Sequence, residues 1–149
     1  MVKILRGTEK HGTMVCESLK SLQAALQAVF GLGHDLVLQQ YLKGGRIVRV
    51  MVLGKKAIAA VEMTKRRKKE KARPKATELT PLCAQTSVRA AEALALEFGV
   101  VELLELDDQV HILELNATPA IPEFEQATGL NLALRVVDHA EQLCKTAAE

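Results

Sequence analysis

The stretch that decides the fold is HILELNATPAIPEFEQATG, residues 111–129, taken together with Glu102 upstream of it. Its apolar start is predicted to form a strand, and strand side chains alternate, so Glu114 and Asn116 fall on one face. Residues 100–104, VVELL, form a second predicted strand that carries Glu102. The sequence therefore predicts an antiparallel hairpin that can bring Glu102, Glu114 and Asn116 together.

The predicted hairpin turns at Asp107-Asp108-Gln109, a typical tight turn. Two carboxylates and an amide oxygen are hard ligands, and they suit a Mg²⁺ ion that keeps several waters and bridges phosphate oxygens. The other interpretation is a solvated face, since acidic side chains on strands usually lie at the surface. The spacing of these residues alone favours neither interpretation over the other.

Length and composition predict one domain, residues 1–149, whose core is built from aliphatic residues, because 48% of residues are hydrophobic and only 3% aromatic. No segment approaches the ~18 consecutive apolar residues of a membrane span. The N-terminal residues lack the pattern of a signal peptide. Cys16, Cys83 and Cys144 share no metal-ligand spacing, so we expect three reduced, packed thiols in a cytoplasmic protein.

The net charge of +2 hides an uneven distribution along the chain. Residues 65–75, KRRKKEKARPK, hold eight basic residues and one acidic residue, a net +7, while the remaining 12 basic and 17 acidic residues give −5. Such a run cannot pack in a core, so we predict a solvated basic loop over residues 64–80. The positive charge of this run also allows salt-sensitive binding to nucleic acid or to an acidic protein. Because the run has no aromatic residue for base stacking, such binding would not depend on nucleotide sequence.

Apolar periodicity and turn residues predict alternating strands and helices. The predicted strands cover residues 2–5, 13–16, 35–40, 46–53 and 57–63, besides the hairpin described above. One helix is capped by Ser18 and another by Thr80, and a third follows a Pro-containing loop and starts at Asn131. Their apolar stripes are Leu19, Leu22, Leu26 and Val29; then Ala84, Val88, Ala91, Ala95 and Phe98, up to Gly99; and last Leu132, Val136, Ala140 and Leu143. Mostly hairpin-connected strands favour an α+β fold with antiparallel sheets and packed helices.

Four segments in this order resemble the nucleotide-binding part of the RimK-like ATP-grasp ligases, which join a carboxylate to an amine with ATP. They are VKILRGTEKHG (2–12), LVLQQYLKGG (36–45), RIVRVMVLGKKAIAAVE (46–62) and VVELLELDDQVHILELNATP (100–119). The Glu-x-Asn-x-x-Pro ending, with an acid twelve residues earlier, is the most specific of these motifs, whereas a lone Gly-rich loop would count for little. The family's N-terminal substrate domain has no counterpart in the sequence.

The resemblance implies a role for each matching residue. Lys3 would contact an ATP phosphate, and the loop containing Gly7, Thr8 and Gly12 would cover the phosphates with its backbone amides. The backbone of Gln40, Tyr41 and Leu42 would meet the adenine edge. Arg49, the arginine of the family's Asp-Ile-Arg signature, is implied as the catalytic residue. Glu102, Glu114 and Asn116 would hold Mg²⁺, with Mn²⁺ as the alternative ion.

The function so implied is the ATP-binding core of a carboxylate–amine ligase that acts through an acyl phosphate. Ile47 stands where the family has the aspartate of its signature, and we expect the chain alone to bind nucleotide with slow or no catalysis. The substrates are not identified by the sequence; an amino acid and an acidic peptide or protein form one possible pair. A second chain would supply the missing domain. Fragment, split enzyme, engineered core and degenerate relative all stay open, as does a non-catalytic module that binds polyanions through residues 65–75.

Overall fold

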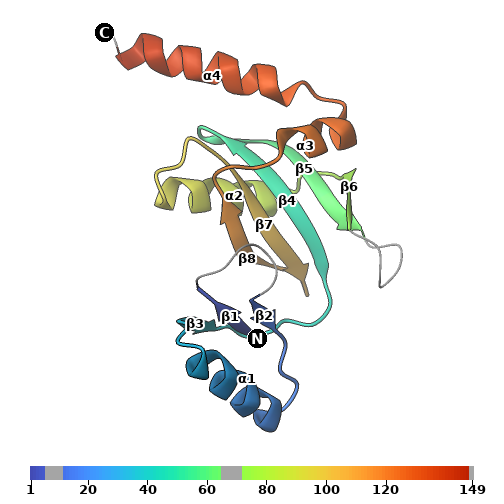
Figure 1. The fold of residues 1–149 in the computed structure, drawn as a ribbon. Coiled ribbons are helices and arrows are strands. Elements are labelled where there is room, and N and C mark those ends of the chain that lie inside the picture. Colours follow the sequence, from blue (N-terminus) through green and yellow to red (C-terminus); the bar gives the residue numbers. More distant parts are fainter. Residues whose placement is uncertain (6–11, 65–71, 148–149) are drawn as a thin grey trace. The chain divides into compact units, whose positions relative to one another are not determined.

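The computed structural model describes residues 1–5, 12–64 and 72–147 (Figure 1). The chain divides into two units, residues 1–43 and 44–149. The first unit contains a three-stranded sheet and the second a five-stranded sheet, and every strand pairing in both is antiparallel. These sheets, with the helices that pack on them, confirm the predicted α+β class.

The first unit pairs three short strands with one helix. Strand β1 (Val2–Ile4) lies between β2 (Thr13–Met14) and β3 (Leu36–Leu38). Helix α1 (Leu19–Gly31) is capped as predicted by Ser18, whose side chain accepts a hydrogen bond from the Ser21 amide in a capping box. Of the predicted stripe only Val29 is fully buried, and Leu19 at the first turn is 70% exposed.

The second unit is built on a sheet in the order β6-β5-β4-β7-β8. The strands are β4 (Arg46–Leu53), β5 (Lys56–Thr64), β6 (Arg73–Ala76), β7 (Phe98–Leu106) and β8 (Gln109–Asn116). Strands β4 and β5 form one hairpin and β7 and β8 another, as predicted. Asp107 and Asp108 have φ values of 50° and 59°, the left-handed backbone that a two-residue hairpin turn requires.

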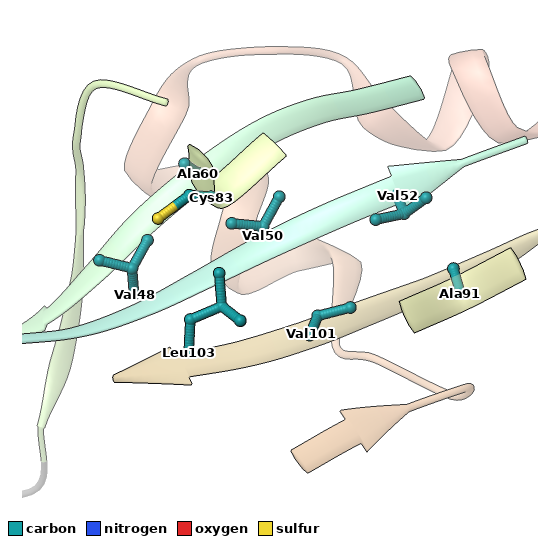
Figure 2. Close-up of a cluster of buried hydrophobic side chains, with 8 residues drawn as sticks. All are labelled: Val48, Val50, Val52, Ala60, Cys83, Ala91, Val101 and Leu103. Carbon is teal, nitrogen blue, oxygen red and sulfur yellow. The ribbon is translucent and has the colours of Figure 1, made fainter. Parts of the chain in front are cut away.

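Two helices cover opposite faces of this sheet. Helix α2 (Pro81–Ala93), capped by Thr80 as predicted, presents Cys83 and Ala91 to the valines of β4 and to Leu103 of β7 (Figure 2). On the other face α3 (Ile121–Thr128) inserts Phe124 against residues of β4, β5 and β7, and Leu132 of α4 (Leu132–Ala147) joins the same cluster. Both faces of the central strands are therefore buried, which explains their nearly continuous apolar sequences.

Three predicted elements differ from the structure. Residues 73–76 lie in strand β6, paired with the end of β5, so the predicted loop over 64–80 is wrong in its later part, while residues 65–71 lie outside the described residues. Helix α2 ends at Ala93 rather than near Gly99, because Ala95 takes φ 51°; Phe98 and Gly99 belong to β7. Residues 121–128 form helix α3 and not a loop, since a proline is compatible with the first turn of a helix.

The last helix and the cysteines also depart from the predictions. Leu132 is fully buried, but Leu143, predicted on the inner face of α4, is 42% exposed, and Ala140 is exposed too. All three cysteines are free; Cys83 is buried, whereas Cys144 is exposed and therefore not packed. In the part of the chain that the structure describes, no helix is both long and apolar enough to cross a membrane.

The connection into β4 is constrained by its backbone. Gly44 and Gly45 have φ values of 96° and 77°. A Cβ atom on Gly45 would lie 2.5 Å from the carbonyl oxygen of Glu105 in the neighbouring strand β7. Position 45 therefore accepts no side chain without a shift of the backbone at the start of β4.

Truncating Leu103 to alanine should lower the free energy of unfolding by about 2–5 kcal/mol, since it removes a fully buried side chain from the cluster under α2. The same truncation at Leu134, which is 54% exposed on α4, should change stability by less than ~0.5 kcal/mol. Urea denaturation followed by circular dichroism measures both variants. Equal losses in the two would contradict the burial pattern of the sheet.

Candidate functional site

Strands β4, β7 and β8 place three predicted site residues side by side. Arg49 is the cross-strand partner of Glu102, and Glu102 is the partner of Glu114. Directly opposed residues share a face of the sheet. Because Val101 and Leu103 on either side of Glu102 pack under α2, this trio lies on the opposite face, the one that α3 covers elsewhere.

Arg49 and Glu102 form an ion pair. The Nε atom of Arg49 donates to Oε2 of Glu102 at 2.6 Å, and their side chains are 34% and 21% exposed. Glu114 is exposed. The guanidinium thus neutralises one of two carboxylates that the register sets opposite each other, an arrangement that would otherwise be destabilising.

Asn116 lies two residues beyond Glu114 on the same alternating face of β8 and pairs with Val100. Its Oδ1 atom accepts a hydrogen bond from the Thr118 amide at 2.8 Å, an Asx turn at the end of the strand. Two carboxylates and an amide oxygen are the donors that Mg²⁺ or Mn²⁺ takes, so the residues fit such an ion in kind. Over residues 1–5, 12–64 and 72–147, no group of three or more His, Cys, Asp or Glu side chains is arranged for a metal.

The residues predicted to contact nucleotide belong to the first unit. Lys3 lies on β1 between Thr13 and Val37, on the face opposite the buried Val2. The carbonyl of Gly12 accepts from the Ile4 amide at 2.8 Å, and a Cβ atom at Gly12 would come within 3.0 Å of the Cβ of Ile4. Close approach of two backbone segments therefore explains this glycine.

The predicted adenine hinge follows β3. The Gln39 amide donates to the carbonyl of Met1 at 2.9 Å, so backbone pairing with the N-terminal segment continues to the residue before the hinge. Gln40 and Tyr41 are exposed, and Leu42 is half-buried. Gly7 and Thr8 lie outside the described residues. The structure thus brings together Arg49, Glu102 and Glu114 in the second unit, while Lys3, Gly12 and the hinge lie in the first.

A polar cluster under α2 was not predicted from the sequence. Arg46 Nε donates to Glu105 Oε2 at 2.7 Å, and its Nη1 donates to Thr77 Oγ1 at 3.1 Å and Glu62 Oε2 at 3.4 Å. The Cys83 thiol donates to Glu105 Oε1 at 2.9 Å. The register of β4 against β7 would have indicated this cluster. The strand pairing that places Arg49 opposite Glu102 also places Arg46 opposite Glu105.

Burial and hydrogen bonding set the protonation of this cluster. Burial raises the pKa of the Cys83 thiol, and its hydrogen bond to Glu105 raises it further. Burial alone would raise the pKa of Glu105, but hydrogen bonds from Cys83 and Arg46 outweigh it and leave that pKa below its usual value. Cys83 is therefore a protonated donor rather than a nucleophile, and the cluster joins α2 to the sheet.

The sequence profile of the RimK-like ATP-grasp domain matches residues 1–140. This chain belongs to the RimK-like ATP-grasp family. Two curated relatives are probable alpha-L-glutamate ligases: one from Stutzerimonas stutzeri is 28% identical over 157 residues, and one from Thioalkalivibrio sulfidiphilus is 32% identical over 155 residues. Each alignment covers 95% of this chain and 50% of the relative, so the chain spans half the length of these proteins.

Solved structures confirm the ATP-grasp fold. The D-alanine–D-alanine ligase of Bacillus anthracis aligns with a TM-score of 0.76 at 17% identity, over 98% of this chain and 55% of that one. The ATP-grasp ligase PsnB, solved with a phosphomimetic variant of its minimal precursor, Mg and ADP, aligns with a TM-score of 0.68 at 20% identity, over 93% and 44%. The predicted family and fold are thus confirmed, with antiparallel sheets in which the pairing of β4 with β7 joins the two hairpins of the larger sheet.

Replacing Glu105 with glutamine should lower the free energy of unfolding by about 1 kcal/mol at pH 7, because it weakens charge-assisted hydrogen bonds in a partly buried cluster. The pKa of Glu105 is lowered in the folded chain, so its stabilisation is present above the ordinary glutamate pKa and is lost as pH falls through the folded value. The difference between the two proteins should therefore shrink on acidification.

Urea titrations between pH 7 and pH 3 measure this difference, with Glu141→Gln on the exposed side of α4 as the control. A constant difference between Glu105→Gln and the unaltered protein across that range would contradict the role of the carboxylate charge.

Proposed function

We propose that this chain is the ATP-binding core of an ATP-dependent carboxylate–amine ligase that acts through an acyl phosphate. The observation that carries the proposal is the alignment of Arg49, Glu102 and Glu114 across three neighbouring strands of a RimK-like ATP-grasp domain. Such an arrangement supplies oxygen ligands for a cation and a guanidinium for a phosphoryl group at one place on the sheet.

Each group has a defined task in this reaction. Glu102, Glu114 and Asn116 would hold Mg²⁺, with Mn²⁺ as the alternative, and the ion when bound offsets the charge of phosphate oxygens. Lys3 neutralises a phosphate, and backbone amides of the loop containing Gly7, Thr8 and Gly12 cover the phosphates. The backbone of Gln40, Tyr41 and Leu42 orients the adenine. Arg49 stabilises the charge on the transferred phosphoryl group and is the proposed catalytic residue.

The bond changes follow from the ligase class. A substrate carboxylate oxygen attacks the terminal phosphorus of ATP, and the bond to ADP breaks. The amine then attacks the acyl carbon of the mixed anhydride, inorganic phosphate leaves, and the amine nitrogen loses its proton to solvent or a neighbouring base. An amide and ADP are the products, so the energy of ATP drives amide formation.

The substrate class rests on the relatives. Those named probable alpha-L-glutamate ligases favour an amino acid and an acidic peptide or protein as the pair. Because half the length of the relatives lies outside the matched region, the partner domain that selects substrates is proposed to come from elsewhere in a longer protein or from a second chain. Three free cysteines fit the reducing cytoplasm as the place of the reaction.

The protein should bind Mg²⁺–ADP with a dissociation constant between micromolar and millimolar, about 4–8 kcal/mol of binding free energy. Glu114→Gln removes the negative charge of one proposed Mg²⁺ ligand and should weaken the magnesium-dependent component of nucleotide affinity about tenfold. Glu141→Gln on α4 should leave this affinity unchanged. Isothermal calorimetry with and without magnesium measures both effects. A folded protein that gives no heat at millimolar nucleotide would rule out nucleotide binding by this chain.

A second candidate function is the non-catalytic binding of nucleic acid or an acidic protein through residues 65–75. The observation in its favour is that Arg73 and Lys75 lie exposed on strand β6, which is an edge strand of the sheet. Exposed cations at an edge can contact phosphates or carboxylates without disturbing the core.

If this second function holds, affinity for a polyanion such as heparin or single-stranded DNA should fall about a hundredfold or more between 50 and 200 mM salt, as expected for ~5 neutralised phosphates. Arg73→Gln with Lys75→Gln should reduce the affinity and the salt slope, with stability nearly unchanged. Fluorescence anisotropy measures the affinity and its salt dependence. The control is a second double variant, Lys20→Gln with Arg89→Gln, which changes the net charge by the same amount. Equal weakening by both pairs would show that only net charge matters and would contradict a site at 65–75.

A further inference from the structure

The ion pair of Arg49 and Glu102 occupies an oxygen that the proposed metal site would use. Arg49 Nε lies 2.6 Å from Glu102 Oε2. Glu102 faces Glu114 directly across β7 and β8. The same carboxylate therefore serves as the partner of an arginine in this structure and, under the proposed function, as the ligand of a divalent cation.

The two partners compete because both are cations at one carboxylate. A guanidinium cannot lose its proton near neutral pH, so it keeps its positive charge and repels a divalent ion at the same oxygen. Without either cation, Glu102 and Glu114 would oppose each other as like charges on paired strands. A positive charge at this position therefore stabilises the strand pairing, and Arg49 provides it from within the chain.

We propose that Arg49 is an internal counter-ion of Glu102 that gives up the carboxylate when a divalent cation binds there. This inference rests on the proposed function and assigns Arg49 a second task, as a positioning residue that holds Glu102 before the cation arrives. Once released from Glu102, the guanidinium can turn to a phosphoryl oxygen. Occupation of the cation site and availability of the catalytic arginine are then coupled in one exchange.

The neighbouring pair on the other face shows why this exchange is specific to Arg49. Arg46 donates hydrogen bonds to Glu105, Glu62 and Thr77. Glu105 also accepts a hydrogen bond from the Cys83 thiol. Displacing Arg46 would break several contacts beneath α2. Arg49 and Glu102, in contrast, are joined to each other by an ion pair and lie beside the exposed Glu114.

The test measures the binding of Mn²⁺ without nucleotide, by the loss of the EPR signal of the free ion. The melting temperature is measured with and without Mn²⁺. Arg49→Gln should bind Mn²⁺ about two- to fivefold more tightly than the unaltered protein, since an ion pair of this exposure contributes up to about fivefold in an equilibrium constant. It should also melt at a lower temperature without metal and gain more from Mn²⁺. Arg49→Lys, which keeps the charge and covers the case of a poorly folded glutamine variant, should lie between them.

Two controls make the result specific. Arg89→Gln removes an exposed charge from α2 and should leave Mn²⁺ affinity unchanged. In a Glu102→Gln background, Arg49→Gln should give no tightening, because the carboxylate through which the two cations compete is gone. Tightening that persists in that background would overturn the exchange.

The remaining outcomes separate this inference from the proposed function. If the unaltered protein binds Mn²⁺ and Arg49→Gln binds it equally or more weakly, Arg49 is no competitor and the inference alone fails. If neither protein binds Mn²⁺ up to millimolar concentration, the metal site of the proposed function fails, and the exchange fails with it.

Discussion

The register of β7 between β4 and β8 is the constraint on which the second unit depends. Strand side chains alternate, so a slip of one residue would move each side chain of β7 to the opposite face and separate the ion pairs that β7 forms with β4. Two features hold the register: the turn at Asp107 and Asp108, whose backbone fits a two-residue hairpin, and the two apolar layers that clamp the strands from either side. The position of Glu102 against Arg49 and Glu114 follows directly from it.

The same register produces two ion pairs of different character. Arg46 with Glu105 and Arg49 with Glu102 are separated by three residues on each strand, an odd number, so they face opposite sides of one sheet. The first pair lies under α2 within a network of side-chain hydrogen bonds and fastens a helix to the sheet. The second is exposed to a similar extent but lies on the face with Glu114. The same pairing of arginine and glutamate therefore joins a helix to the sheet on one face and lies beside a second carboxylate on the other.

Local signals in the sequence predicted much of this structure. The caps at Ser18 and Thr80, both hairpins and the acidic strands follow from side-chain chemistry within a few residues, and these elements formed as expected. Strand β6 was missed because eight basic residues suggested a solvated loop, whereas pairing with β5 gives its backbone partners that composition cannot show. Helix α3 was not predicted because prolines favour loops, whereas Pro122 stands in the first turn of the helix, where a proline is tolerated.

The candidate site was predictable in its residues and less so in its contacts. Glu102 and Glu114 were expected to meet, and the register brings them together, but no pattern in the sequence indicated that Arg49 would reach Glu102 first. That contact depends on which strand lies next to β7, and β4 is more than forty residues away in the chain. The Arg46 cluster was missed for the same reason, since its partners come from four separate segments.

The glycine pair that leads into β4 has a practical consequence for anyone who wishes to dissect or recombine the two units. Gly45 abuts the backbone of β7, so a junction engineered after it would disturb the first rung of the central strand. Lys43 lies before both glycines and is exposed, which makes it the natural place to insert a spacer or to separate the coding sequence. The boundary between the units is thus asymmetric: Lys43 on its upstream side is exposed, and Gly45 on its downstream side is fixed by contact with a neighbouring strand.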